Sequence, residues 1–397
     1  MEFFPRQTVI IAVLVLFLGK FLTKRINALK AFNIPEPVTG GMLASVCFSL
    51  IYVIFDFNIS FSLMQRDVLL VIFFTTIGLN AKFSTLLEGG KSLVILLLLA
   101  ICYLFLQNLT GIGATMLTDL PPATGVLGGS VSLSGGHGTA IAWAPSFENR
   151  FGVINAAEIG IACATFGLVL GGVIGGPVAK YLINKHNLSS TSKAQLSVGI
   201  KNEKQQSISV DSVLTLLLVL SIAVGLGLNL HKLLASMGVM LPIFVPCLFA
   251  GILLTNSVPL IFKKISWVSQ TPTLALVSDL SLGLFLAMSL MSLQLWALID
   301  LAGPILLILA AQLILTLSFS IFFVFRFLGK NYDAAVITSG YAGLALGATP
   351  TAIANMTAVT KKYGASPKAF IIVPLVGAFF IDLTNAVIIQ MMLNWIN

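Results

Sequence analysis

The chain has 397 residues, of which 57% are hydrophobic and 9% charged, and its mean hydropathy is +1.02. A soluble domain usually carries about 25% charged residues, so this composition excludes a soluble globular protein and a disordered chain. The net charge is +8, but 22 Lys and Arg residues stand against 14 Asp and Glu residues, and they form no basic patch dense enough to bind nucleic acid. We therefore expect an integral membrane protein.

Ten apolar runs follow one another along the chain. A bilayer core about 30 Å thick needs about 20 apolar residues in a helix. Helices are the expected spans, because lipid cannot satisfy free backbone groups and the alternating pattern of a barrel is absent. The predicted transmembrane helices cover residues 8–23, 38–55, 68–82, 92–117, 153–183, 211–230, 240–262, 273–293, 301–327 and 367–396.

Two further segments, 121–147 and 334–360, are rich in Gly, Ser, Thr and Ala and are interrupted by glycine or proline. Each is too broken for one regular helix and too apolar for a solvated loop. Irregular backbone is tolerated at membrane depth only where protein or a water-filled cavity covers it. We therefore predict that both segments are re-entrant hairpins.

The basic residues predict the orientation of this all-α fold. With the amino terminus outside and each hairpin returning to its own side, all but four of the 22 Lys and Arg residues lie on the cytoplasmic side. The four outside are Arg6, Arg66, Arg150 and Lys232. This bias obeys the positive-inside rule. Both termini are expected outside, and the polar linker 184–210 is expected in the cytoplasm.

The two halves of the chain, 1–183 and 211–397, resemble each other. The sequence Thr-Ala-Ile-Ala begins at Thr139 in the first hairpin and recurs at Thr351 in the second. Each half holds an odd number of spans, five, so the second copy must enter the membrane upside down. Inverted repeats with interrupted segments at matching positions are typical of secondary transporters. The tips of the two hairpins are then expected to meet near the midplane, which suits alternating access.

The first hairpin carries a glycine-rich turn. Glycines allow a sharp turn and bring bare N–H groups close to a ligand, and a helix that starts there points its positive end at an anion. Close packing of small residues is the alternative. His137 either donates to a substrate carboxylate or only fixes the turn. The predicted substrate-binding residues here are Ser134, Gly135, Gly136, His137, Gly138 and Thr139.

The second hairpin has a similar break between Gly347 and Thr351. Proline suits the first turn of a new helix, where its missing N–H costs nothing. The neighbouring hydroxyls can bind a carboxylate or a cation. The predicted substrate-binding residues here are Thr349, Pro350, Thr351 and Asn355.

Polar residues inside the last span predict an ion site. A charge at this depth is costly and usually marks an ion or substrate path. Asp382 and Asn385 are three residues apart, which puts both on one helix face. Oxygen ligands at that spacing suit sodium, with Thr349 and the weaker candidate Glu158 completing the predicted set. The alternative for Asp382 is a neutral carboxyl in a structural hydrogen bond.

The sequence shows little sign of an enzymatic or channel function. No general acid–base pair or activated nucleophile emerges, so we expect no enzyme, no catalytic residues and no cofactor besides the coupling ion. An intramembrane enzyme and a channel are the alternatives from other classes, and a channel would need a repeated polar pore face.

The motifs resemble those of the bacterial sodium/glutamate symporter family over nearly the whole chain. The residues that carry the resemblance are Ser134–Thr139, Gly347–Met356, Gly377–Asp382, Ile34–Val38, Thr76–Asn80 and Gly329–Val336. The resemblance implies sodium-driven uptake of L-glutamate across the bacterial inner membrane by a homodimer. A di- or tricarboxylate symporter of the same architecture is the alternative.

The resemblance also implies a division of labour within the fold. Spans four, five, nine and ten with both hairpins would form a domain that carries the substrate in an elevator-like movement. Spans one to three and six to eight would form the static scaffold and the dimer contact.

Overall fold

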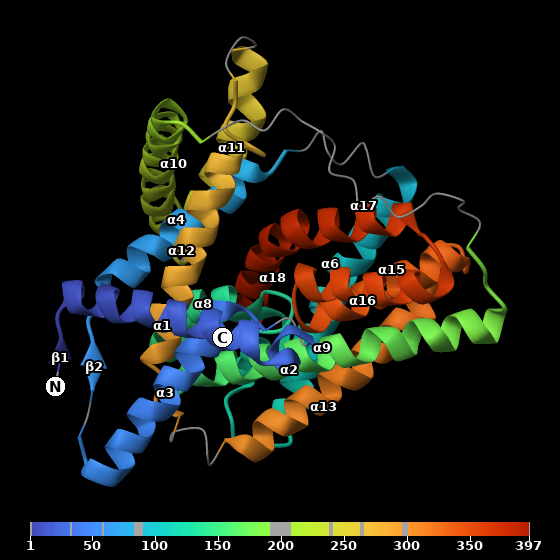
Figure 1. Cartoon of the computed structure of the whole chain (residues 1–397), viewed down its shortest axis with the longest axis horizontal. Coiled ribbons are helices and arrows are strands. Elements are labelled where there is room, and N and C mark those ends of the chain that lie inside the picture. The colour runs from blue at the N-terminus through green and yellow to red at the C-terminus, as the bar shows by residue number, and fades with distance from the viewer. Residues whose placement is uncertain are drawn as a thin grey trace. The chain divides into compact units, whose positions relative to one another are not determined.

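The computed structural model describes residues 2–31, 34–57, 59–82, 90–190, 208–237, 241–262, 266–295 and 301–396. Over these residues the secondary structure is helical apart from one short parallel ladder, formed by β1 (Glu2–Phe3) and β2 (Ser60–Phe61) (Figure 1). The ladder was not expected, because two-residue strands leave no periodic pattern in a sequence.

Among the described residues, eight helices are long and apolar enough to cross a bilayer, which confirms the membrane-protein class. Seven of them are unbroken. The eighth, residues 302–327, combines α13 (Ala302–Phe319), the π-turn η3 (Ser320–Val324) and α14 (Phe325–Phe327). The seven are α1 (Pro5–Arg25), α3 (Glu36–Phe55), α6 (Gly90–Thr115), α9 (Ala156–His186), α10 (Val210–Ser236), α11 (Phe244–Ile261) and α12 (Pro272–Met291).

The two remaining apolar runs are also helical, but shorter or interrupted. The third run forms α4 (Met64–Asn80), which ends at residue 80 because Ala81 leaves the helical conformation (φ −82°, ψ 86°). The tenth run is divided into α17 (Pro367–Leu375), the π-turn η4 (Val376–Phe380) and α18 (Ile381–Trp395). A short helix, α2 (Asn27–Ala31), follows α1.

The two broken segments each contain a pair of helical pieces. The first runs through α7 (Pro122–Val126), the π-turn η1 (Leu127–Val131) and α8 (Gly136–Phe151). The second consists of α15 (Tyr332–Leu346) and α16 (Thr349–Tyr363), which pack against each other.

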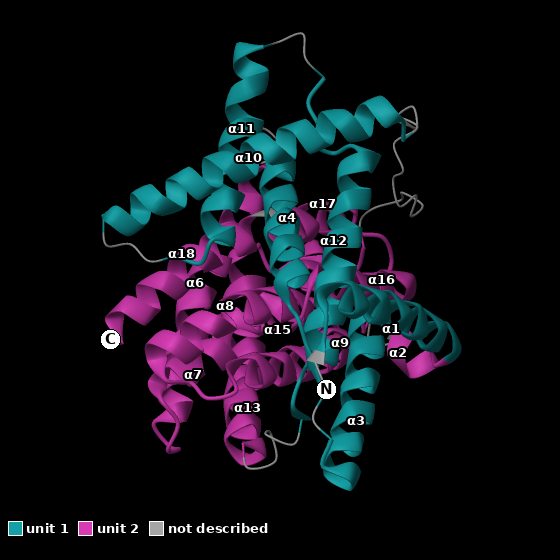
Figure 2. Ribbon diagram, turned by 90° about the vertical axis from the view of Figure 1, so that its left-hand side faces the viewer, with its two compact units in different colours: residues 1–25, 35–84, 200–295 teal, residues 26–34, 85–199, 296–397 magenta. Residues whose placement is uncertain are grey.

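The chain divides into two compact units, each assembled from separate stretches of sequence (Figure 2). Unit 1 comprises residues 1–25, 35–84 and 200–295, and unit 2 comprises residues 26–34, 85–199 and 296–397. Unit 1 therefore contains spans one to three and six to eight, and unit 2 contains spans four, five, nine and ten with both broken segments. This is the grouping of spans that the family resemblance implied.

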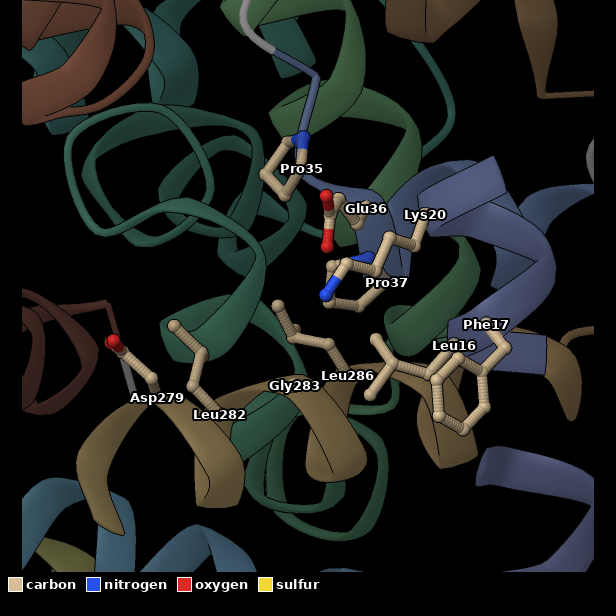
Figure 3. Close-up of a pocket in the computed structure, with 10 residues that line it drawn as sticks. All are labelled: Leu16, Phe17, Lys20, Pro35, Glu36, Pro37, Asp279, Leu282, Gly283 and Leu286. Atoms are coloured by element: carbon tan, nitrogen blue, oxygen red, sulfur yellow. The ribbon is translucent and has the colours of Figure 1, made fainter. Parts of the chain in front are cut away.

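Unit 1 is held together by close helix contacts. A Cβ atom on Gly19 of α1 would lie 2.0 Å from the carbonyl oxygen of Glu36, so α1 and α3 meet backbone to backbone. A pocket of about 430 Å³ lies between α1, α3 and α12 and is lined by Lys20, Glu36 and Asp279 beside apolar side chains (Figure 3). None of the predicted site residues lines this pocket.

Unit 2 has an apolar core drawn from α6, α9, α13 and α15 to α17. The hydroxyl of Tyr103 on α6 lies 2.6 Å from Thr316 Oγ1 on α13, so even this buried polar pair is satisfied. Gly167 of α9 faces the end of α15, where an added Cβ would lie 2.4 Å from the carbonyl oxygen of Leu346. The close approach brings α9 against the second broken segment.

Candidate functional site

The first broken segment turns back at a run of small residues. Gly129 leaves the helical conformation inside η1 (φ −97°, ψ −124°), and residues 132–135 form a turn. The helix α8 then begins at Gly136, whose φ of +70° lies in the left-handed region that glycine adopts without strain. The predicted break is therefore present, with α8 starting at the glycine-rich motif.

The second broken segment has a sharper break. The helix α15 ends at Leu346, Gly347 is non-helical (φ −146°, ψ −103°), and Ala348 is extended. The helix α16 begins at Thr349 with Pro350 in its first turn, where proline removes only an N–H that has no helical partner.

The two breaks meet inside unit 2. The Oγ atom of Ser134 lies 2.6 Å from Gln107 Oε1 and 3.2 Å from the carbonyl oxygen of Ala345. Gln107 Nε2 donates to the same carbonyl at 2.9 Å. A Cβ atom on Gly136 would lie 3.9 Å from the carbonyl oxygen of Gly347. The amino-terminal ends of α8 and α16 therefore lie close together inside unit 2.

This arrangement suits an anion. Free N–H groups and the positive end of the helix dipole gather at a helix amino terminus. At the junction of the two breaks, two such termini, at Gly136 and Thr349, contribute to one region. A carboxylate is the simplest group that this region could bind.

The histidine of the first turn reaches a neighbouring helix. His137 is 6% exposed, and its Nε2 atom lies 3.0 Å from Thr165 Oγ1 on α9. This contact favours the interpretation in which the ring fixes the turn. Ser134 and Thr139 are buried beside it at 8% and 6% exposure.

The second set of predicted substrate residues divides into two groups. Thr349 Oγ1 lies next to Gly377 of η4, and Thr351 is fully buried with no hydrogen-bond partner for Oγ1 among the described residues. Asn355 instead donates from Nδ2 to the carbonyl oxygen of Gly171 at 2.9 Å and so ties α16 to α9. A Cβ atom on Gly175 would lie 2.1 Å from that Nδ2 atom.

The predicted sodium residues occupy different parts of unit 2. Asn385 is 1% exposed and donates from Nδ2 to the carbonyl oxygen of Ser130 at 2.8 Å. Asp382 lies one turn before it and is half-buried. Thr349 is beside Gly377, and Glu158 lies in the first turn of α9.

Three buried amide side chains at the site were not predicted from the sequence. Gln107 and Asn108 lie on α6 and Gln312 on α13, and all three are fully buried. Asn108 Oδ1 accepts from the backbone N–H of Ser130 at 3.0 Å, and Gln312 Nε2 donates to the carbonyl oxygen of Gln107 at 2.7 Å. In the sequence, these amides lie in the middle of otherwise apolar runs, Gln107 and Asn108 side by side and Gln312 alone. A hydropathy value averaged over a run hardly changes with one or two amides, so it does not reveal them.

Comparison with known proteins gives a consistent result. A family model described as "Sodium/glutamate symporter" matches residues 1–365. A protein of Haemophilus influenzae named sodium/glutamate symporter is 42% identical over 396 residues, covering 98% of this chain and 97% of the relative. Proteins of that name from Escherichia coli and Shigella flexneri are each 42% identical over 402 residues, covering 97% of this chain and 96% of the relative.

Proposed function

Since the chain belongs to the sodium/glutamate symporter family, we propose that it is a secondary transporter that carries L-glutamate into the bacterial cell together with Na⁺. The family is one of transporters rather than enzymes, and the multi-pass helical fold agrees with it. The proposed location is the bacterial inner membrane, with both termini outside and the linker 184–210 in the cytoplasm.

The junction of the two breaks carries this proposal. Glutamate has two carboxylates, and this junction combines two helix amino termini with the hydroxyls of Ser134, Thr139, Thr349 and Thr351. Gln107 links the junction to α6. Asn355 and His137 belong to the same segments and stabilise their shape through α9.

Alternating access follows from the proposed topology. The broken segments 121–147 and 334–360 are re-entrant hairpins of two inverted repeats, 1–183 and 211–397, which enter the membrane from opposite sides. Unit 2 carries substrate and ion in an elevator-like movement, and unit 1 is the scaffold that pairs with a second copy in a homodimer. The proposed sodium ligands lie in unit 2, at Asp382, Asn385, Thr349 and Glu158.

Coupling requires that the movable closed state forms mainly when both ligands are bound. Because binding linkage is reciprocal, Na⁺ must raise the affinity for glutamate by the same factor by which glutamate raises the affinity for Na⁺. Equal glutamate affinity with and without Na⁺ would contradict tight coupling.

The test is uptake of labelled L-glutamate into liposomes that contain the purified protein, under an inward Na⁺ gradient. Accumulation with Na⁺ and none when K⁺ replaces it supports symport. Citrate, malate and D-glutamate are added as competitors in parallel. No glutamate uptake in tight vesicles that do accumulate labelled citrate or malate would overturn the glutamate assignment in favour of a carboxylate symporter.

A further inference from the structure

Ser130 occupies an unusual position in unit 2, because both of its backbone polar groups are bound by amide side chains. Its N–H donates to Asn108 Oδ1 of α6 at 3.0 Å, and its carbonyl oxygen accepts from Asn385 Nδ2 of α18 at 2.8 Å. The same carbonyl oxygen also accepts from the N–H of Gly135 at 2.9 Å. Ser130 therefore joins α6, α18 and the turn that leads to Gly136.

These bonds fix the orientation of both amides. A backbone N–H can meet only the oxygen of Asn108, and a backbone carbonyl can meet only the nitrogen of Asn385. The atoms left over are Asn108 Nδ2, Asn385 Oδ1 and the hydroxyl oxygen of Ser130 itself. All three are buried and lack a hydrogen-bond partner in the described part of the chain.

Such atoms need an explanation, because buried polar groups in native proteins almost always have a partner. Ser130 is 0% exposed and Asn385 is 1% exposed, so bulk water does not satisfy them. Both leftover oxygens belong to residues in direct contact, and they lie beside the backbone break at Gly129. In transporters, backbone carbonyls of unwound helix segments coordinate Na⁺, and neutral side-chain oxygens beside such a segment are of the ligand type that hard cations prefer.

We propose that Ser130 Oγ and Asn385 Oδ1 bind the coupling Na⁺, with carbonyl groups of the break or water completing the coordination. This inference rests on the proposed symport function and changes the predicted ligand set, since it adds Ser130 and leaves out Thr349 and Glu158. Asp382 precedes Asn385 by one turn on α18, and its carboxylate supplies negative charge near the ion. Thr349 and Glu158 are not needed for this site.

The first turn connects the proposed ion site to the substrate region. Ser134 follows Ser130 by four positions, and its hydroxyl contacts Gln107 and Ala345 at the junction of the two breaks. An ion held between Ser130 and Asn385 would stabilise the contact of α18 with the first turn. The turn from Ser130 to Gly136 would then be ordered before glutamate binds.

The test is Na⁺ binding in the absence of glutamate. The full-length protein is purified in detergent, and its melting temperature is measured at increasing Na⁺ concentration, with choline chloride keeping the ionic strength constant. A ligand that binds only the folded state raises the melting temperature. The variants are Ser130→Ala, which removes the oxygen, and Ser130→Cys, which replaces it by a sulfur that suits hard cations poorly. Ser320→Ala is the matched control, since Ser320 is also fully buried with an unpartnered Oγ.

We expect both Ser130 variants to raise the half-saturating Na⁺ concentration by about 10- to 100-fold, the range found when support of a metal site is lost. Ser320→Ala should match the wild type. A variant that runs as a single species on gel filtration and binds Na⁺ as the wild type does would overturn the inference. A Ser130 variant that leaves the Na⁺ response intact but weakens glutamate binding would also overturn it, because the oxygens would then serve the substrate ammonium.

Failure of the inference can be separated from failure of the proposed function. Wild-type protein that accumulates glutamate with Na⁺, together with a Ser130→Ala variant of unchanged Na⁺ half-saturation, refutes the site and leaves symport standing. Wild-type protein that binds Na⁺ through Ser130 but accumulates no glutamate supports the site and refutes glutamate symport.

Discussion

Gln107 is the residue whose replacement tests the junction of the two breaks most directly. Its side chain accepts from Ser134 of the first break and donates to Ala345 of the second, and it is fully buried. Gln107→Leu keeps the size of the side chain and removes both of these hydrogen bonds, together with a longer one from Nε2 to the Tyr103 hydroxyl at 3.5 Å. Uptake of glutamate should fall, because the two breaks lose their shared support on α6.

The loss of stability can be estimated from these contacts. The carbonyl of Ala345 keeps Ser134 Oγ at 3.2 Å as a donor, so the substitution leaves no bare carbonyl behind. The two short hydrogen bonds at about 0.5–1.5 kcal/mol each give a destabilisation of about 1–3 kcal/mol, to which the long bond to Tyr103 adds little. Leucine fills the space, so no cavity term adds to this value.

The assay combines the melting temperature of the purified variant with its initial rate of glutamate uptake at saturating Na⁺. Gln390→Leu is the matched control, because Gln390 is a buried glutamine of unit 2 whose hydrogen bond, at 2.8 Å, goes to Asn394 on its own helix. The control should keep its uptake rate. Wild-type melting and uptake in Gln107→Leu would refute the reasoning that this amide holds the two breaks together.

Three further substitutions follow from the geometry. Gly136→Ala and Gly152→Ala both strain a left-handed residue by about 1–2 kcal/mol. Only Gly136→Ala should raise the half-saturating glutamate concentration in uptake assays, because nothing lies within 4 Å of a Cβ on Gly152. Equal effects of the two variants on uptake would count against the junction as the substrate site. Gly175→Ala should lower the melting temperature, because the new methyl group would overlap the Asn355 amide that ties α16 to α9, and overpacking costs about 1–3 kcal/mol. Gly176→Ala is the control: a Cβ there meets open space, so the melting temperature should not change. Asp382→Asn should raise the half-saturating Na⁺ concentration for uptake, and an unchanged Na⁺ dependence would remove this carboxylate from the ion site.

The ten apolar runs were sufficient to predict the helices, because length and hydropathy are local properties of the sequence. Where the runs were interrupted, local chemistry again gave the right places: α8 starts at the glycine motif and α16 starts one residue before Pro350. The end of α4 and the π-turn η4 depend on packing, and no residue pattern specified them.

The pairing of site residues was less accessible to the sequence. Gln107 and Asn108 lie in the middle of an apolar run, where two amides barely change the average hydropathy. Their partners on other elements lie up to 238 residues away, as for Gln107 and Ala345. Asn385 was predicted as an ion ligand from its depth in the last span and its three-residue spacing from Asp382, and its contact with Ser130 could be found only in the folded structure.

The division of each unit among distant stretches of sequence has a consequence for biosynthesis. Unit 2 needs residues 85–199 and 296–397, so the first stretch is made before the second exists. At about 5–20 residues per second, the 238 residues between Gln107 and Ala345 take about 10 to 50 s to synthesise. During that interval a buried amide in a newly inserted helix lacks its final acceptor, and lipid offers no substitute. The early helices must therefore wait, with provisional partners or protected by the insertion machinery, until residues 296–397 are made.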